Sequence, residues 1–284
     1  MRFLFVDKIT DLRGDAIRGL RVYPADEPLV HRTPGHLAAV APGAVSEAIG
    51  QLASWLCLER NRFAARPIFL FADAIRVRGA VRPGDEVELR AEIRAMDVDN
   101  FRFDGEARVG GRLVQEIEAC SGHFMPLAEL EDPALTCARF AALIGGGLVL
   151  DGPGGAPYPF AALAGETLAL VAGRSVRARK EFSADEPFYG DHFPRFPVTP
   201  IVMLNEMIGA TTTRLLGGEK SIQIRAIHGI KIRSFVRPGE TVETVVTVTG
   251  ERRDGGRSFL ETTAQVLKDQ KVILRGNYLY EIME

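Results

Sequence analysis

The stretch VRPGD at residues 81–85 returns as VRPGE at residues 236–240, an offset of 236 − 81 = 155. A second stretch, ADEP at residues 25–28, returns at residues 184–187, an offset of 184 − 25 = 159. The four-residue change between the two offsets is the size of an ordinary loop deletion. Because similarity at a fixed spacing is the mark of a structural unit built more than once, the 284-residue chain is predicted to hold two copies of one unit.

Each copy is predicted to contain one long helix followed by antiparallel strands. Residues 42–60 and 200–216 carry apolar residues at spacings of three and four, the first opened by Pro-Gly and the second stopped by Gly-Gly. After each helix the pattern changes: residues 87–94 alternate apolar with charged, and residues 241–249 are rich in β-branched residues. A helix that covers one face of such a sheet gives an α+β unit.

The domain boundaries follow from a segment rich in Gly and Pro between the copies. We predict a first domain at residues 1–128 with its helix at about 42–60, and a linker at residues 129–157. The second domain is predicted at residues 158–284, with its helix at about 200–216. A short helix is expected at residues 131–144, just before the glycines of the linker.

The composition is typical of a globular protein and argues against binding to nucleic acid or to a membrane. The chain is 46% hydrophobic and 25% charged, with a net charge of −2, so no bulk field attracts nucleic acid or a membrane surface. It has no apolar run long enough for a membrane span, and its first residues do not resemble a signal peptide. The three cysteines fit no metal-type or CxxC spacing, so we expect no metal and a cytoplasmic location with reduced thiols.

One loop carries a family resemblance. Residues 186–200, EPFYGDHFPRFPVTP, resemble the β-hydroxyacyl-acyl-carrier-protein dehydratases, which share a His-Phe-Pro-Gly-x-Pro loop, a helix-opening Pro-Gly and a Glu-Ala-x-x-Gln segment. His192 and Glu206 lie 206 − 192 = 14 residues apart, the family's spacing between its catalytic histidine and its catalytic acid. The resemblance implies a double hot-dog fold, in which two fused hot-dog domains each wrap an antiparallel sheet around a long helix.

The two copies depart from the family pattern in complementary ways. In the second copy Arg195 replaces the loop glycine, Ile201 the helix-opening glycine and Ala210 the helix glutamine. In the first copy the ungapped alignment places Thr33 opposite His192, so the histidine is missing, yet PG at residues 42–43 and EAIGQ at residues 47–51 are kept. Each copy therefore retains a different part of the family's site.

Because the family's active sites combine a histidine from one hot dog with an acid from the other, the resemblance implies one complete composite site. We predict His192 and Glu47 as its catalytic pair. The residues predicted to position the substrate or its oxyanion are Gly43, Ala44, Gln51, Phe193 and Pro197.

A reciprocal second site would combine Glu206 with Thr33 or His36. It is expected to be inactive, because Thr33 cannot act as a base. Two interpretations of His31 and His36 stay open: a shifted loop restores a base to this site, or both are exposed loop residues, which is the favoured interpretation.

The chemistry of dehydration suits these groups. Removing the proton beside a thioester carbonyl requires a base, and a neutral imidazole supplies one near its ordinary pKa. A carboxyl group protonates the departing hydroxyl, and free N–H groups at a helix start, with Gly43 allowing close approach, stabilise the thioester oxygen. A simpler interpretation also exists for Glu47 and Glu206, because an acid near a helix start commonly just complements the helix dipole.

The predicted function is dehydration of 3-hydroxyacyl thioesters to 2-enoyl thioesters in fatty-acid or polyketide-type synthesis. The substrate would be carried on an acyl carrier protein or CoA, with no cofactor beyond that phosphopantetheine arm. The alternatives are an acyl thioesterase, since hot-dog folds also host hydrolases, and a non-catalytic protein that binds acyl carriers. The fused pair is expected to be a monomeric pseudo-dimer or a larger homo-oligomer.

Overall fold

The computed structural model describes residues 3–32, 37–148, 157–217 and 220–283. The first part of the chain forms β1 (Lys8–Arg13), β2 (Ala16–Val22), β3 (Val30–His31), β4 (Ala39–Val40), α1 (Pro42–Arg60), β5 (Ala65–Val77), β6 (Glu86–Met96), β7 (Asn100–Val109), β8 (Arg112–Pro126), α2 (Leu127–Leu130) and α3 (Pro133–Gly145). The second part forms the 3₁₀ helix η1 (Phe160–Ala164), β9 (Glu166–Val171), β10 (Ser175–Glu181), α4 (Ile201–Thr213), the 3₁₀ helix η2 (Arg214–Leu216), β11 (Ser221–Ile232), β12 (Thr241–Asp254), β13 (Arg257–Lys268) and β14 (Lys271–Met283).

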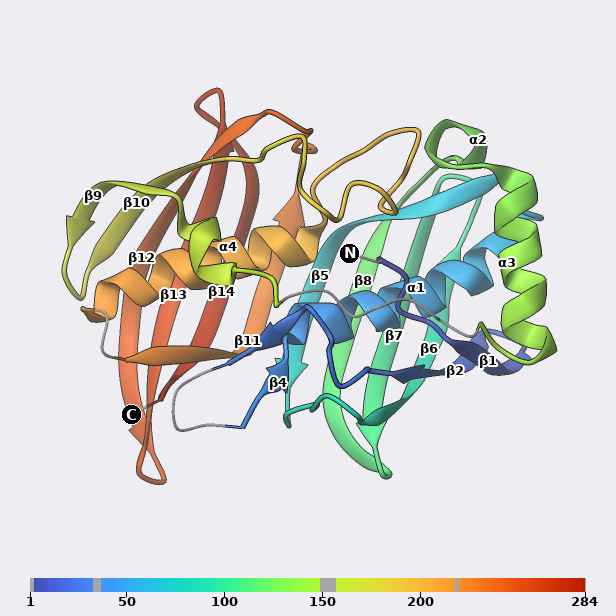
Figure 1. Ribbon diagram of the computed structural model, residues 1–284, viewed down its shortest axis with the longest axis horizontal. Helices are drawn as coiled ribbons and strands as arrows, with labels where there is room; N and C mark the ends of the chain where they lie inside the picture. The colour runs from blue at the N-terminus through green and yellow to red at the C-terminus, as the bar shows by residue number, and fades with distance from the viewer. Residues whose placement is uncertain (1–2, 33–36, 149–156, 218–219, 284) are drawn as a thin grey trace.

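Most of the described strands build one large antiparallel sheet with a pseudo-twofold arrangement, and β3 pairs with β4 in a separate two-stranded sheet. The twelve strands of the large sheet run in the order β1-β2-β6-β7-β8-β5-β11-β14-β13-β12-β10-β9, and β5 and β11 join the two halves. From this joint outward the two halves repeat the same order, β5 matching β11, β8 matching β14 and so on to β1 and β9. Figure 1 shows α1 and α4 lying across the same side of the sheet, one in each half. This is the predicted double hot-dog.

The helix α1 is more deeply enclosed than its sequence suggests. The apolar spacing predicts a single buried stripe, but every residue from 48 to 58 is buried. The helix contacts β2 and all of the strands from β5 to β8, so the sheet curls around it. On a helix that is buried on all sides, each side chain must be apolar or have a hydrogen-bond partner within the protein. This explains the small and apolar residues between 48 and 58.

The repeated VRPG segments fix the approach to each helix. Gly84 (φ 94°) and Gly239 (φ 78°) adopt the left-handed conformation that glycine tolerates, and the following Asp85 and Glu240 side chains each accept a backbone hydrogen bond within the turn. The carbonyl oxygen of the valine that opens each segment accepts a hydrogen bond from the backbone just before the helix. The Val40 N–H donates to Val81 in the first copy, and the Thr199 N–H donates to Val236 in the second. The repeat therefore positions the two helix starts.

The two helix starts meet at the centre of the molecule. A Cβ added at Gly43, near the beginning of α1, would lie 3.0 Å from the Cβ of Val202, near the beginning of α4. Only a glycine allows this approach without displacing the neighbour. The site residues carried by each helix are thereby brought beside the opposite half of the chain.

The segment between the copies is only partly described. α2 and α3 cover residues 127–130 and 133–145, so the predicted short helix is present, and residues 149–156 of the predicted linker lie outside the described residues. The second long helix ends earlier than predicted, because α4 stops at Thr213 and the chain continues as η2 to a left-handed Gly217. The domain limits at residues 128 and 158 remain predictions. Within the described ranges, no helix combines the length and hydropathy of a membrane span.

Candidate active site

His192 lies in the loop between β10 and α4, with its ring held by the backbone. Its Nδ1 atom is 2.8 Å from the carbonyl oxygen of Val198. Because a carbonyl oxygen can only accept a hydrogen bond, the hydrogen of the neutral ring is on Nδ1. The other ring nitrogen, Nε2, therefore carries a free lone pair, as a general base requires.

The surroundings of His192 keep its imidazole neutral. Burial lowers the pKa of His192 to about 4, the Arg66 guanidinium acts in the same direction, and the hydrogen bond to Val198 opposes both. The charged ring would lose its hydration without gaining a carboxylate in direct contact. Above this pKa the ring is available as a base.

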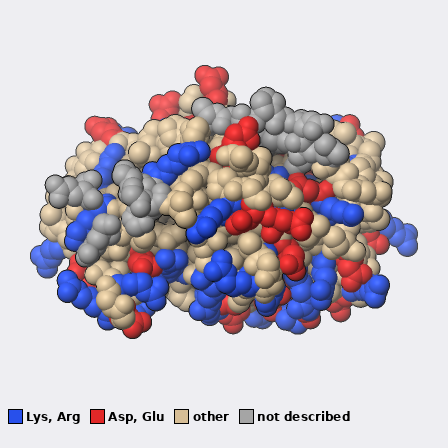
Figure 2. Space-filling view, turned by 60° about the horizontal axis from the view of Figure 1, so that its bottom comes forward, with Lys and Arg blue, Asp and Glu red and all other residues tan. Residues whose placement is uncertain are grey.

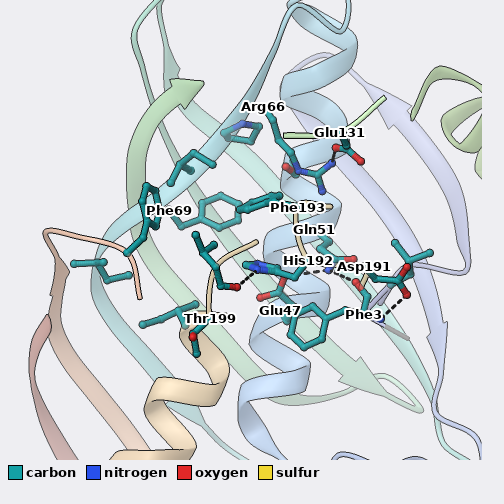
Figure 3. A pocket seen from close by; sticks show the side chains of 18 of the residues that line it. Phe3, Glu47, Gln51, Arg66, Phe69, Glu131, Asp191, His192, Phe193 and Thr199 are labelled. Atoms are coloured by element: carbon teal, nitrogen blue, oxygen red, sulfur yellow. Dashed lines mark hydrogen bonds and ion pairs between the residues drawn. The ribbon is translucent and has the colours of Figure 1, made fainter. Parts of the chain in front are cut away.

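Glu47 faces the same cavity from the first half of the chain. It lies on α1, and Gln51, one turn later, donates a hydrogen bond from Nε2 to its Oε1 atom over 3.0 Å. Burial raises the pKa of Glu47, while the Gln51 hydrogen bond and Arg66 partly offset this. Figure 3 shows Glu47 and Gln51 on α1 close to His192, which comes from the second half.

Gln51 also fastens the N-terminal segment over the site. Its Nε2 donates to the carbonyl oxygen of Phe3 (3.1 Å), and its Oε1 accepts from the Phe5 N–H (2.9 Å). Asp191 accepts a hydrogen bond from the Phe3 N–H over 3.2 Å, and the Phe3 and His192 rings meet edge to face with centroids 5.3 Å apart. Sequence reasoning missed Phe3, since nothing in the pattern of residues 1–7 links that segment to Asp191, 188 residues away.

The cavity around His192 is narrow, with a free volume of about 90 Å³. Its walls are largely apolar and aromatic and come from both halves, as shown by Phe3, Phe69, Phe193, Leu204, Ile232 and Phe235. At one end, visible in Figure 3, lies the ion pair of Arg66 and Glu131. An apolar slot of this size with polar groups at defined positions is suited to the reactive end of an extended chain.

Phe193 holds a strained position beside the histidine. Its backbone has φ 55°, in the left-handed region that bulky residues rarely adopt. The ring lies against His192 with centroids 4.4 Å apart and faces the Arg66 guanidinium at 5.7 Å. Such strain persists only where the surroundings enforce it, and it is frequent at functional sites. The predicted Pro197 is half-buried in the same loop and does not line the cavity.

Arg195, which stands where the family has glycine, anchors the loop to the segment between the two copies. Its backbone N–H donates to Leu130, and its guanidinium donates to the carbonyl oxygen of Ala128 (3.0 Å) and to Asp132 (3.4 Å). Arg195 in place of glycine therefore fixes the loop to α2 and to Asp132 by hydrogen bonds. It leaves the His192 ring in the cavity.

Gly43 and Ala44, which are predicted to position the substrate or its oxyanion, do not line the His192 cavity, and their role stays a prediction. Both are buried at the start of α1; Gly43 packs against α4, and the Ala44 carbonyl oxygen accepts a hydrogen bond from Tyr23. The helix start that reaches the cavity is that of α4, where Ile201 lines the wall. α1 faces the cavity with Glu47 and not with its first turn, because its first turn packs against the start of α4.

At the reciprocal position only part of the predicted set is described. Thr33 and His36 lie outside the described residues. Glu206, however, does have a histidine partner: His31 Nε2 lies 2.9 Å from Glu206 Oε2. Of the two interpretations of His31, the contact fits the one in which a shifted loop brings a histidine to this site, because β3 turns His31 towards α4 although the ungapped alignment does not match it with His192.

Comparisons with known proteins identify the family and the fold. The ApeI-like family model, described as ApeI dehydratase, matches residues 170–269. A 3-hydroxyacyl-[acyl-carrier-protein] dehydratase FabZ from Pediococcus pentosaceus is 35% identical over 108 residues, which cover 36% of this chain and 70% of that protein.

Two solved structures share the fold at low identity. The dehydratase domain of PpsC from Mycobacterium tuberculosis, in complex with C12:1-CoA, has a TM-score of 0.55 at 16% identity and covers 99% of this chain and 98% of that one. A putative oleoyl thioesterase from Lactobacillus plantarum has a TM-score of 0.60 at 11% identity and covers 95% of this chain and 97% of that one. Identities this low speak for the fold alone, whereas the FabZ match is closer and spans most of the relative. The chain belongs to the 3-hydroxyacyl-[acyl-carrier-protein] dehydratase FabZ family.

Proposed function

We propose that this protein is a hydro-lyase that dehydrates 3-hydroxyacyl thioesters to 2-enoyl thioesters at one composite site between its two halves. The observation that carries the proposal is the pairing of His192, with its hydrogen on Nδ1 and Nε2 free, with Glu47 in one cavity. The substrate is bound to the phosphopantetheine arm of an acyl carrier protein or of CoA. No group other than these side chains and the backbone is needed for the reaction.

In this reaction His192 acts as the base and Glu47 as the acid. His192 Nε2 takes the proton from the carbon beside the thioester carbonyl, and the electron pair of that C–H bond forms the new double bond as the C–O bond at the next carbon breaks. Glu47, in its protonated form, which burial favours by raising its pKa, gives its proton to the departing hydroxyl, which leaves as water. The proton on His192 then returns to Glu47, so the site is restored.

The start of α4 supplies the stabilisation of the thioester oxygen in this proposal. The first N–H groups of a helix have no acceptor within the helix, and they lie at its positive end. Ile201, the first residue of α4, lines the cavity beside Val198 and Thr199. Its N–H is therefore the group that we assign to the oxygen on which charge develops.

The direct test is turnover by the purified full chain. We expect 3-hydroxyacyl-CoA and acyl-carrier-protein thioesters of several chain lengths to yield 2-enoyl thioesters, measured by enoyl absorbance, without release of free thiol. Thiol release in place of enoyl formation would assign the protein to thioester hydrolysis. Tight acyl binding with neither product would assign it to a non-catalytic role.

The pH profile offers a second test. Because His192 must be neutral to act as a base and its pKa is lowered to about 4, kcat/KM is expected to hold as the pH falls through 6.5 and to drop only as it approaches about 4. The measurement uses brief exposure to each pH, with recovery at neutral pH as the control for unfolding. An acid limb at the ordinary histidine pKa near 6.5 would contradict the assignment of this buried ring as the base.

A further inference from the structure

A larger cavity lies at the pseudo-symmetric position, around His31 and Glu206. Its volume is about 770 Å³, against about 90 Å³ around His192, and it falls within the range of roughly 300–1,000 Å³ that is usual for ligand pockets. Its wall comes from both halves of the chain, with β4 on one side and α4 and β11 on the other, elements that Figure 1 shows next to one another. The apolar part of the wall consists of Leu37, Ala39, Val40, Ala210, Ile222 and Ile224.

This cavity repeats the plan of the His192 site. Glu47 is the sixth residue of α1 (47 − 42 + 1 = 6), and Glu206 is the sixth residue of α4 (206 − 201 + 1 = 6). Each glutamate faces a histidine from the opposite half, His192 for the first and His31 for the second. Two cavities built alike from the same fold elements are suited to the same class of ligand.

In this cavity the histidine and the glutamate are in direct contact with each other, which distinguishes the cavity from the His192 site. The Glu206 side chain is only 6% exposed and binds His31 Nε2, and its other oxygen lies beside Gly43 at the start of α1. Although burial acts to lower it, the pKa of His31 is raised by the charge and hydrogen bond of Glu206. Nε2, the nitrogen that is free in His192, is occupied by Glu206, and the protonated ring that this contact favours carries a hydrogen on both nitrogens and has no lone pair to act as a base.

His31 is nevertheless placed to donate a hydrogen bond to a ligand in the cavity. Its side chain is 39% exposed, while its ring is stacked on Phe160 with centroids 4.5 Å apart, so its orientation is fixed. With Nε2 engaged by Glu206, the Nδ1–H group of the protonated ring remains as a hydrogen-bond donor. Arg82, exposed in the same wall, adds a cation suited to the phosphates of a carrier arm.

We propose that this cavity is a second acyl-binding site, which takes the acyl chain of a thioester and donates a hydrogen bond from His31 to its carbonyl oxygen. The choice of ligand rests on the proposed function, because it follows from the pseudo-symmetry with the His192 site. The second site holds the thioester without dehydrating it, since its histidine is not a free base. One chain then binds two acyl thioesters and turns over one.

The test blocks the cavity without touching either acid–base pair. Gly209 lies in its wall on α4, and a Cβ added there meets nothing within 4 Å. Gly209→Phe therefore projects a ring into the cavity, and Gly209→Ala is the matched control that leaves it open. The probe is decanoyl-CoA, which lacks the 3-hydroxyl group and cannot be dehydrated, and its stoichiometry is measured by calorimetry on the full chain.

We expect two decanoyl-CoA molecules per chain for the wild type and for Gly209→Ala, and one for Gly209→Phe. Turnover of 3-hydroxyacyl thioesters is expected to be unchanged in both variants, which also shows that they are folded. One molecule per wild-type chain, or two per Gly209→Phe chain, would overturn the proposal. The count is independent of turnover, so a protein with two binding sites and no dehydration would refute the proposed function alone.

A second arm separates the two sources of an acyl chain. Free decanoate carries the same chain, and its carboxylate can accept the His31 hydrogen bond, but it lacks the phosphates that Arg82 would bind; we expect it to bind the second site about tenfold or more weakly, which is the size of one lost hydrogen bond to a charged group. Equal or tighter binding of decanoate at the position blocked by Gly209→Phe would show that the cavity takes free fatty acids, and the thioester proposal would fail.

Discussion

Replacing His192 by alanine is expected to lower kcat/KM for 3-hydroxyacyl thioesters by about 10²- to 10⁴-fold, the usual contribution of one general base. The ring is the only group in the described part of the cavity that combines a free nitrogen lone pair with a lowered pKa. Acyl-chain contacts come from other walls, so KM is expected to change much less than kcat. Initial rates of enoyl formation over a range of substrate concentrations separate the two constants.

A structural role for His192 can be told apart from a chemical one. His192→Asn keeps a side-chain N–H that can donate to the carbonyl oxygen of Val198, but it supplies no base. We expect it to preserve the thermal stability of the wild type and to lose as much activity as the alanine variant. His228→Ala, an exposed histidine on β11, controls for histidine loss in general. Activity retained in His192→Asn would exclude His192 as the base.

Glu47→Gln is expected to cause the second large loss, again about 10²- to 10⁴-fold in kcat/KM. The amide has the shape of the acid and can still meet Gln51, but it cannot deliver a proton to the leaving hydroxyl. Because burial raises the pKa of Glu47, the wild-type site holds that proton more readily than an exposed glutamate does. The loss should therefore appear in single-turnover rates, where product release plays no part.

Glu206→Gln is the matched control, because it makes the same change at the same position of the other helix. Glu206 is engaged by His31 and lies outside the His192 cavity, so we expect activity within a few-fold of the wild type. If Glu206→Gln were as damaging as Glu47→Gln while the protein stayed folded, the single composite site would have to be abandoned. A change in decanoyl-CoA binding to the second cavity, without loss of turnover, would fit both proposals.

The departures from the family pattern have different consequences in the structure. Arg195 ties the histidine loop to α2 and the segment that follows it, so the missing glycine is replaced by hydrogen bonds. Ile201 opens α4 with a side chain that forms part of the cavity wall. Ala210, in place of glutamine, faces the larger cavity and leaves it more apolar. All three positions therefore shape a cavity or hold a loop.

Much of the fold was readable from local patterns, because each of those patterns has a local physical cause. The repeated VRPG segments require a left-handed glycine and a capping acid, and both copies form that turn. Periods of three to four and of two distinguish the helices from the strands. The pairing of His192 with Glu47 was also accessible, since the family motif remains split between the two copies.

Other features depended on contacts that local sequence does not encode. The meeting of Gly43 with Val202 turns the first turn of α1 away from the cavity, and no residue spacing shows this. His31 reaches Glu206 because β3 and β4 place it there, against an alignment that pointed to Thr33. Phe3 joins the site through Gln51 and Asp191, two contacts that are long-range in sequence.

The sequence by itself determined that the chain is a repeated helix-and-sheet unit and that the two copies are unequal, and it predicted His192 and Glu47 as the catalytic pair. Residue type, spacing and turn chemistry act over a few residues and can be read from one segment at a time. Only the tertiary structure decided which helix start faces each cavity, which histidine partners Glu206, and where the larger cavity lies. These depend on how two curved half-sheets join at β5 and β11 and on the close packing of two helix starts, which are properties of the whole assembled chain.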